Sequence, residues 1–177
     1  MSTLSASRRD LIALLGACCM FLSLLELMIP KPVPFLRLGL ANLPVLVSLG
    51  LLTGPQVLLV VAIKVIGQGL VNGTLFSYVF VLSAAGSLAS ALGMLVVSRF
   101  GPSLISFVGI SVIGAMASTI TQLALASLLV FGRSGRLIAP PFLAVGLATA
   151  VALGFVAAAF CRTSAWYRMA QESGRRG

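Results

Sequence analysis

One apolar segment of this chain, residues 56–78, carries a lysine near its middle. The segment, QVLLVVAIKVIGQGLVNGTLFSY, has the length of a membrane span and contains Lys64, Gln68 and Asn72. A lysine at the centre of a membrane helix costs roughly 2.5–3.5 kcal/mol on insertion scales, so it implies a polar partner or an aqueous cavity. The sequence therefore predicts a polar site inside a membrane-embedded protein.

The rest of the composition supports a polytopic membrane protein, with 59% hydrophobic and 8% charged residues. The basic residues lie mostly between apolar runs, which is typical of topology signals and argues against nucleic-acid binding. Only Asp10, Glu26 and Glu172 are acidic, and histidine is absent. Catalytic carboxylate pairs, zinc sites and magnesium diphosphate sites need more acids or histidines than this, and no phosphate-binding loop motif is present. We therefore expect no enzyme activity, no cofactor and no metal.

The apolar runs and turn signals predict an all-α bundle of six transmembrane helices. We expect an N-terminal tail over 1–10, a membrane domain over 11–161 and a basic tail over 162–177. Arg8 and Arg9 favour a retained first helix over a cleaved twin-arginine or lipoprotein signal. The predicted spans are about 11–29, 38–53, 56–72, 75–97, 104–131 and 137–161.

The cations predict the orientation of the chain. Six spans place both termini on one side, together with seven arginines: Arg8, Arg9, Arg99, Arg162, Arg168, Arg175 and Arg176. The other side holds four cations, namely Lys31, Arg37, Arg133 and Arg136. Positively charged loops stay in the cytoplasm, so we expect both termini in the cytoplasm of a prokaryotic cell, with the chain in its cytoplasmic (inner) membrane.

With this topology, several polar residues fall toward the outer face and could line one pocket. Lys64 and Gln68 lie four residues apart and share a helix face that leads to Asn72. The candidate substrate-binding residues are Lys64, Arg37, Asn42, Glu26, Gln68, Asn72, Thr74 and Gln122. The cations favour an anionic or phosphorylated small molecule. Alternatively, Glu26 pairs with Lys64 and only neutralises it, and Gln122 makes an interhelical hydrogen bond.

Several motifs together resemble one family. They are PKPVPFLRLGLAN at 30–42, Ile63 and Lys64 followed by GTLFS at 73–77, AGSLAS at 85–90, GISVIGA at 109–115, and Gln122. Over about residues 11–161 the chain resembles the Gx transporter family, also labelled heptaprenyl diphosphate synthase component I. That family is similar to the S components of energy-coupling factor transporters. The family's Asn shortly before the glutamine is missing, and Thr119 and Thr121 occupy its neighbourhood.

The resemblance implies an S-component-like six-helix protein that captures a small molecule at the outer face. A transmembrane coupling protein and ATPase subunits would then supply the energy. It also gives weight to Ala13 and Ala17, because S components use such a small-residue pattern on the first helix to pack against the coupling protein. An isoprenoid diphosphate or a vitamin-like precursor would suit as substrate.

The sequence thus favours the substrate-binding subunit of an uptake transporter. The alternative is a membrane accessory subunit of a polyprenyl (heptaprenyl) diphosphate synthase system, since the chain lacks the aspartate-rich motifs of the synthase itself. A self-sufficient ion-coupled carrier is disfavoured, because the sequence shows no internal duplication and only one intramembrane carboxylate.

Overall fold

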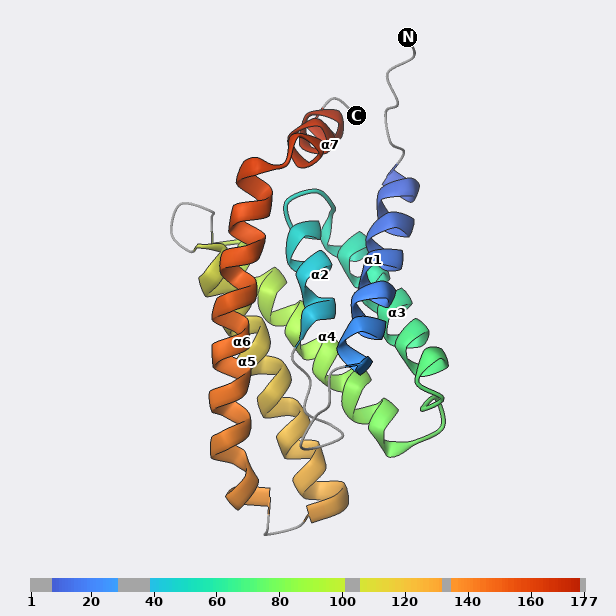
Figure 1. Cartoon of the computed structure of the whole chain (residues 1–177), viewed down its shortest axis with the longest axis vertical. Coiled ribbons are helices and arrows are strands. Elements are labelled where there is room, and N and C mark those ends of the chain that lie inside the picture. The colour runs from blue at the N-terminus through green and yellow to red at the C-terminus, as the bar shows by residue number, and fades with distance from the viewer. Residues whose placement is uncertain (1–7, 29–38, 101–105, 132–134, 176–177) are drawn as a thin grey trace.

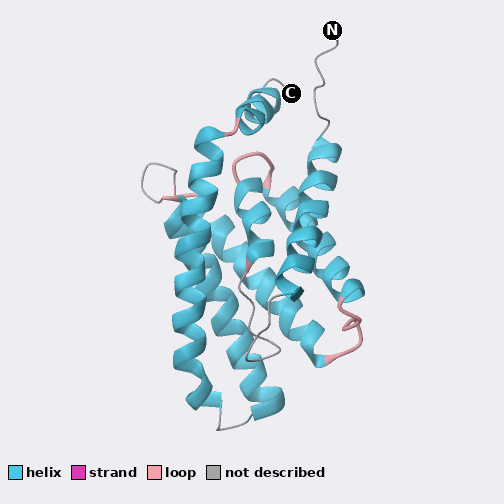
Figure 2. Ribbon diagram, in the orientation of Figure 1, coloured by secondary structure: helices cyan, strands magenta, loops and turns pink. Residues whose placement is uncertain are grey.

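A computed structural model describes residues 8–28, 39–100, 106–131 and 135–175, and every regular element in these ranges is a helix (Figures 1 and 2). The elements are α1 (Arg8–Met28), the 3-10 helix η1 (Leu40–Asn42), α2 (Leu43–Ser48), α3 (Gly54–Val71), α4 (Tyr78–Ser98), α5 (Phe107–Ala126), the π-helix η2 (Ser127–Phe131), α6 (Gly135–Thr163) and α7 (Ala165–Arg175).

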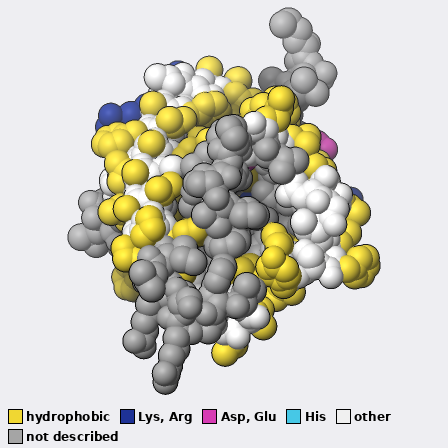
Figure 3. Space-filling model, turned by 60° about the horizontal axis from the view of Figure 1, so that its bottom comes forward, with side chains coloured by type: hydrophobic (Ala, Val, Ile, Leu, Met, Phe, Trp, Pro, Cys, Tyr) yellow, Lys and Arg dark blue, Asp and Glu magenta, His cyan; other side chains and the backbone are white. Residues whose placement is uncertain are grey.

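Four of the described helices are long and apolar enough to cross a membrane. They are Gly54–Val71, Tyr78–Ser98, Phe107–Leu129 and Pro140–Thr163. Large hydrophobic side chains are exposed along them, and Figure 3 shows hydrophobic side chains over much of the described surface on one face. In water such a surface would drive association, whereas in lipid it is matched to its surroundings. The chain is therefore a membrane protein.

Over the described part of the predicted second span, 38–53, the structure has no helix of membrane-spanning length, and the predicted count of six spans is not confirmed. Over this range the structure has only η1 and the six-residue α2, which rises about 9 Å at 1.5 Å per residue. Pro44 to Ser48 are all buried, because α2 contacts α1, α3, α5 and α6. This segment is apolar because it lies among other helices.

Local sequence signals explain where the neighbouring helices begin. Thr53 and Gln56 form a capping box at the start of α3, in which the Thr53 N–H donates to Gln56 Oε1 at 3.0 Å. Ser106 caps α5 by accepting from the Gly109 N–H at 3.2 Å. After α3 the chain turns through Gly73, whose φ of 63° is readily adopted only by glycine. The observed first residues of α3, α4 and α5 lie within three residues of the predicted ones.

The helices form two groups that meet around α2 (Figure 1). α1 packs on α3, while α5 packs extensively on both α4 and α6. α4 connects the groups, because it also contacts α3. The start of α1 and the end of α6 lie at the same end of the bundle, where α7 follows after a short turn. That both of these ends face the cytoplasm stays a prediction.

At this end, α7 is docked by Tyr167, which is 6% exposed and packs in a cluster with Val47 of α2 and Cys161 of α6. Its hydroxyl occupies the place that a Cβ at Gly50 would take. The predicted basic tail therefore includes a helix that contacts the turn after α2.

Burial, together with the neighbouring Cys161, raises the pKa of Tyr167 to about 12 from its usual value near 10. Between these two values an unfolded Tyr167 loses its proton before the docked one does, so the free energy of unfolding of α7 should fall as pH rises. We expect the ultraviolet titration of the wild type minus that of Tyr167→Phe to have its midpoint near pH 12. A Tyr78→Phe variant is the control, and a difference midpoint near pH 10 would show that α7 is not docked.

Candidate functional site

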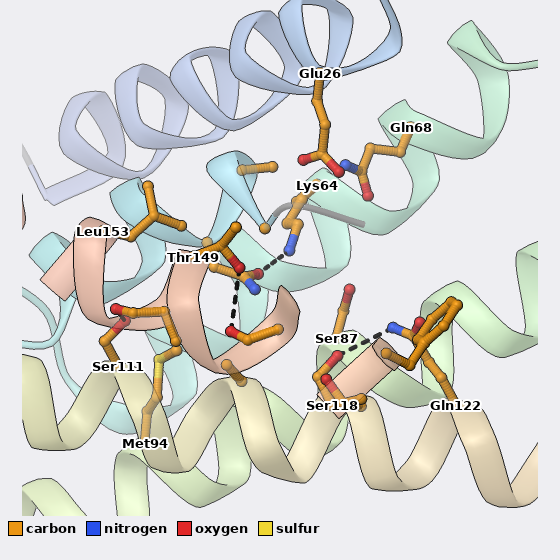
Figure 4. A pocket seen from close by; sticks show the side chains of 18 residues that line it. Glu26, Lys64, Gln68, Ser87, Met94, Ser111, Ser118, Gln122, Thr149 and Leu153 are labelled. Atoms are coloured by element: carbon orange, nitrogen blue, oxygen red, sulfur yellow. Dashed lines mark hydrogen bonds between the residues drawn. The ribbon is translucent and has the colours of Figure 1, made fainter. Parts of the chain in front are cut away.

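A polar cavity lies where the two helix groups meet, and α1, η1, α3, α4, α5 and α6 all contribute to its wall (Figure 4). The space open to the centre of a water-sized sphere is about 50 Å³. One water needs roughly 10–15 Å³ by this measure, so the cavity has room for a few waters or a small polar molecule. The lining residues are Glu26, Gly39, Ala41, Asn42, Lys64, Gln68, Ser87, Met94, Ser111, Ala115, Ser118, Thr119, Gln122, Phe142, Gly146, Thr149, Ala150 and Leu153.

Lys64 projects from α3 into this cavity and is only 4% exposed. Its Nζ donates a hydrogen bond to Oδ1 of Asn42. Asn42 is held at the junction of η1 and α2, where its backbone N–H donates to the Gly39 carbonyl at 2.8 Å. Gly39 has φ 79°, so this turn also depends on a glycine. The buried lysine thus has a polar partner, as its position within an apolar segment predicted.

Gln68 lies one turn further along α3 and points toward Glu26 of α1 (Figure 4). Its Nε2 donates to Ser23 Oγ, which in turn donates to the Cys19 carbonyl at 2.7 Å. Gln68 and Glu26 are 6% and 5% exposed. Because Ser23 is itself hydrogen-bonded to the backbone of α1, it fixes the orientation of the Gln68 side chain at the cavity wall.

Close packing of α1 and α3 keeps these polar groups together. A Cβ at Gly67 would lie 2.8 Å from Met20 Sδ, and one at Gly16 would lie 2.9 Å from Ile63 Cγ2. Small residues at such contacts let membrane helices approach each other closely. Gly16 of α1 and Gly67 of α3 therefore allow the close approach that keeps Lys64 and Gln68 near α1.

The opposite wall is formed by a polar stripe of α5, of which only Gln122 was a predicted pocket residue. Ser111, Ala115, Ser118 and Gln122 are spaced by three or four residues and share one helix face. Gln122 Nε2 donates to Ser118 Oγ at 3.0 Å, and Ser111 Oγ donates to the Ala150 carbonyl of α6 at 2.8 Å. The spacing was the available signal, but hydroxyl groups are common in membrane helices and give a weak pattern.

Ser87 of α4 and Thr149 of α6 add to the polar lining. Ser87 was not among the predicted pocket residues, and it lies at the cavity. Beside it, the absence of a side chain at Gly86 leaves the space that the Gln122 amide occupies. Thr149 Oγ1 donates to carbonyls of its own helix, at 2.9 Å to Val145 and 3.1 Å to Gly146.

The structure therefore brings five of the eight predicted pocket residues to one cavity: Glu26, Asn42, Lys64, Gln68 and Gln122. Asn72 and Thr74 follow α3 and are not part of its lining. Asn72 Oδ1 is buried and has no hydrogen-bond partner among the described residues. Arg37 lies outside the described residues. That any of these residues binds a substrate stays a prediction.

Two further predictions concern the face of α1 that carries Ala13 and Ala17, and metal binding. Ala13 and Ala17 are both exposed on α1, on the side opposite the buried Leu15 and Cys19. Among the described residues, no three His, Cys, Asp or Glu side chains come close enough together to hold a metal ion.

The fold and the cavity define a class: an all-helical membrane protein with a buried polar site between apolar helices. The family model described as heptaprenyl diphosphate synthase component I matches residues 15–160, and the chain belongs to this family. The match confirms the resemblance that the motifs predicted. No curated protein and no solved structure matches the chain.

Proposed function

We propose that this chain is a non-catalytic membrane subunit that binds a small molecule in the cavity between α3 and α5. The observation that carries the proposal is the burial of Lys64 and Glu26 at one polar cavity inside a bundle of apolar helices. Ionisable groups are costly in such surroundings and are found there mainly at binding and transport sites. The apolar residues of the lining enclose the ligand, and the polar residues orient it.

The family description supports one partner system directly, a heptaprenyl diphosphate synthase system in which this chain is the membrane accessory subunit. Because the chain has one aspartate, the diphosphate chemistry would belong to a soluble partner enzyme. The chain would hold that enzyme at the membrane and bind a small molecule there.

The cavity and α1 support a second system, an uptake transporter in which this chain is the substrate-binding subunit. Ala13 and Ala17 lie exposed on one face of α1, where a coupling protein could pack closely. In this role a transmembrane coupling protein and ATPases would open the cavity to each side of the membrane in turn.

Purification in a mild detergent, followed by mass spectrometry of the bound proteins and small molecules, tests the proposal. A soluble prenyl synthase whose product length changes when this chain is deleted would support the accessory role. A transmembrane protein with ATPases would support the uptake role. Recovery of the chain with neither a protein partner nor a small molecule would contradict both.

Ala17→Trp should remove the protein partner while leaving small-molecule binding unchanged, since Ala17 is exposed and does not line the cavity. A tryptophan at this position would keep α1 from packing closely against a helix of the partner protein. The matched control is Ala152→Trp, at an exposed alanine of α6. The proteins that copurify with each variant are the measurement, and equal recovery of the partner with both would show that α1 is not the docking face.

A further inference from the structure

We infer that the cavity takes a small polar molecule without net charge, a zwitterion, rather than a diphosphate. The inference rests on the proposed function and specifies the class of ligand for the same site.

The described lining has no net charge. Of its eighteen residues, Lys64 carries one positive charge and Glu26 one negative charge, and the remaining sixteen are uncharged. Both charged side chains are at least nine-tenths buried. A net charge placed in such a site is costly unless the protein compensates it. A diphosphate carries two or more negative charges and would meet one lysine and an opposing carboxylate among the described lining residues, whereas a zwitterion brings one charge for each.

The two charged groups lie on one side of the cavity, beside the amides of Asn42 and Gln68, and other uncharged polar groups lie across it. Lys64, Glu26 and Gln68 extend from α1 and α3, while Ser87, Ser118 and Gln122 extend from α4 and α5 across the cavity (Figure 4). A ligand that places its two charged groups against α1 and α3 would therefore direct an uncharged polar end toward α5. The amide and hydroxyl groups there both donate and accept hydrogen bonds, so a carbonyl, amide or hydroxyl group suits that end.

The apolar part of the wall and the volume limit the size of the ligand. Met94, Phe142 and Leu153 form the apolar part, and the cavity of about 50 Å³ holds a few waters. A polyprenyl chain exceeds this space many times over, so the part of the ligand that lies within the described lining is compact.

Glu26→Gln distinguishes a zwitterionic ligand from a diphosphate, because the variant keeps the shape of the side chain and removes its negative charge. For a zwitterion, the loss of Glu26 removes the partner of the cationic group and should reduce binding about 10-fold or more. For a diphosphate, the same change removes a repulsion and should strengthen binding. The two ligand classes thus predict effects of opposite sign.

The experiment is native mass spectrometry of the full chain purified in mild detergent, with inorganic pyrophosphate and isopentenyl diphosphate as added competitors. We expect a small phosphate-free adduct on the wild type and on Glu172→Gln, an exposed carboxylate control in α7. Glu26→Gln should lose the adduct, and neither competitor should displace it from the wild type. Ser118→Ala, which keeps both charges, should also lower its occupancy and provides a second test if Glu26→Gln does not fold.

A phosphate-bearing adduct, displacement by either competitor, or tighter pyrophosphate binding by Glu26→Gln would overturn the inference and leave the proposed binding function standing. A wild-type protein with no adduct and no response to either competitor would overturn the inference and the proposed function together.

Discussion

Replacing Lys64 with methionine should reduce ligand binding by about 10- to 100-fold, because a hydrogen bond to a charged group contributes about 1.5–3 kcal/mol. Methionine has nearly the same length as lysine and is apolar, so the variant fills the same space at the cavity wall. The fraction of purified protein that carries a small-molecule adduct in native mass spectrometry measures the effect. Arg99→Met is the matched control, since Arg99 is exposed at the end of α4 and does not line the cavity.

The same measurement, together with the thermal unfolding midpoint, separates a binding role of Lys64 from a purely structural pairing with Glu26. A structural pair predicts that Lys64→Met and Glu26→Gln both lower the thermal unfolding midpoint and that neither alters the selectivity for ligands. A binding role predicts folded variants with altered occupancy. Equal occupancy in Lys64→Met, Arg99→Met and the wild type would contradict a role for Lys64 in the pocket.

Replacing Gly154 with alanine should destabilise the bundle by about 1–3 kcal/mol, the usual cost of overpacking a close contact. A Cβ at Gly154 of α6 would lie 2.6 Å from the Val108 Cα of α5. The clash involves backbone, so the two helices would have to separate. The intrinsic preference of alanine for helix, about 1 kcal/mol over glycine, offsets only part of this cost.

Gly93→Ala in α4 is the matched control, because a Cβ there would meet Ala117 Cβ at an ordinary distance of 3.4 Å. We expect its thermal unfolding midpoint in detergent to equal or exceed that of the wild type, and the midpoint of Gly154→Ala to fall. If the two variants unfold at the same temperature, α5 and α6 do not approach as closely as the structure shows. Separation of these helices would also displace Ser111 from the Ala150 carbonyl at the cavity.

Lys64 and Gln68 illustrate how much of the site was predictable from the sequence. Their spacing of four residues within an apolar segment fixed a common helix face, and the cost of a buried cation required a polar partner. Both conclusions depend on residues close together in the chain. The partner itself, Asn42, is 22 residues away, and its orientation depends on the turn at Gly39 and on the position of α2.

The sequence by itself determined the class of this protein, an apolar helical membrane protein with an ionisable site inside it, because composition and helical periodicity are local properties. Only the tertiary structure decided that α2 is a short central helix, since hydropathy cannot distinguish a segment buried by lipid from one buried by other helices. It also decided that the hydroxyl groups of α5 and α6 face Lys64 across one cavity. That arrangement follows from which helices pack together, and packing depends on contacts between residues far apart in the chain.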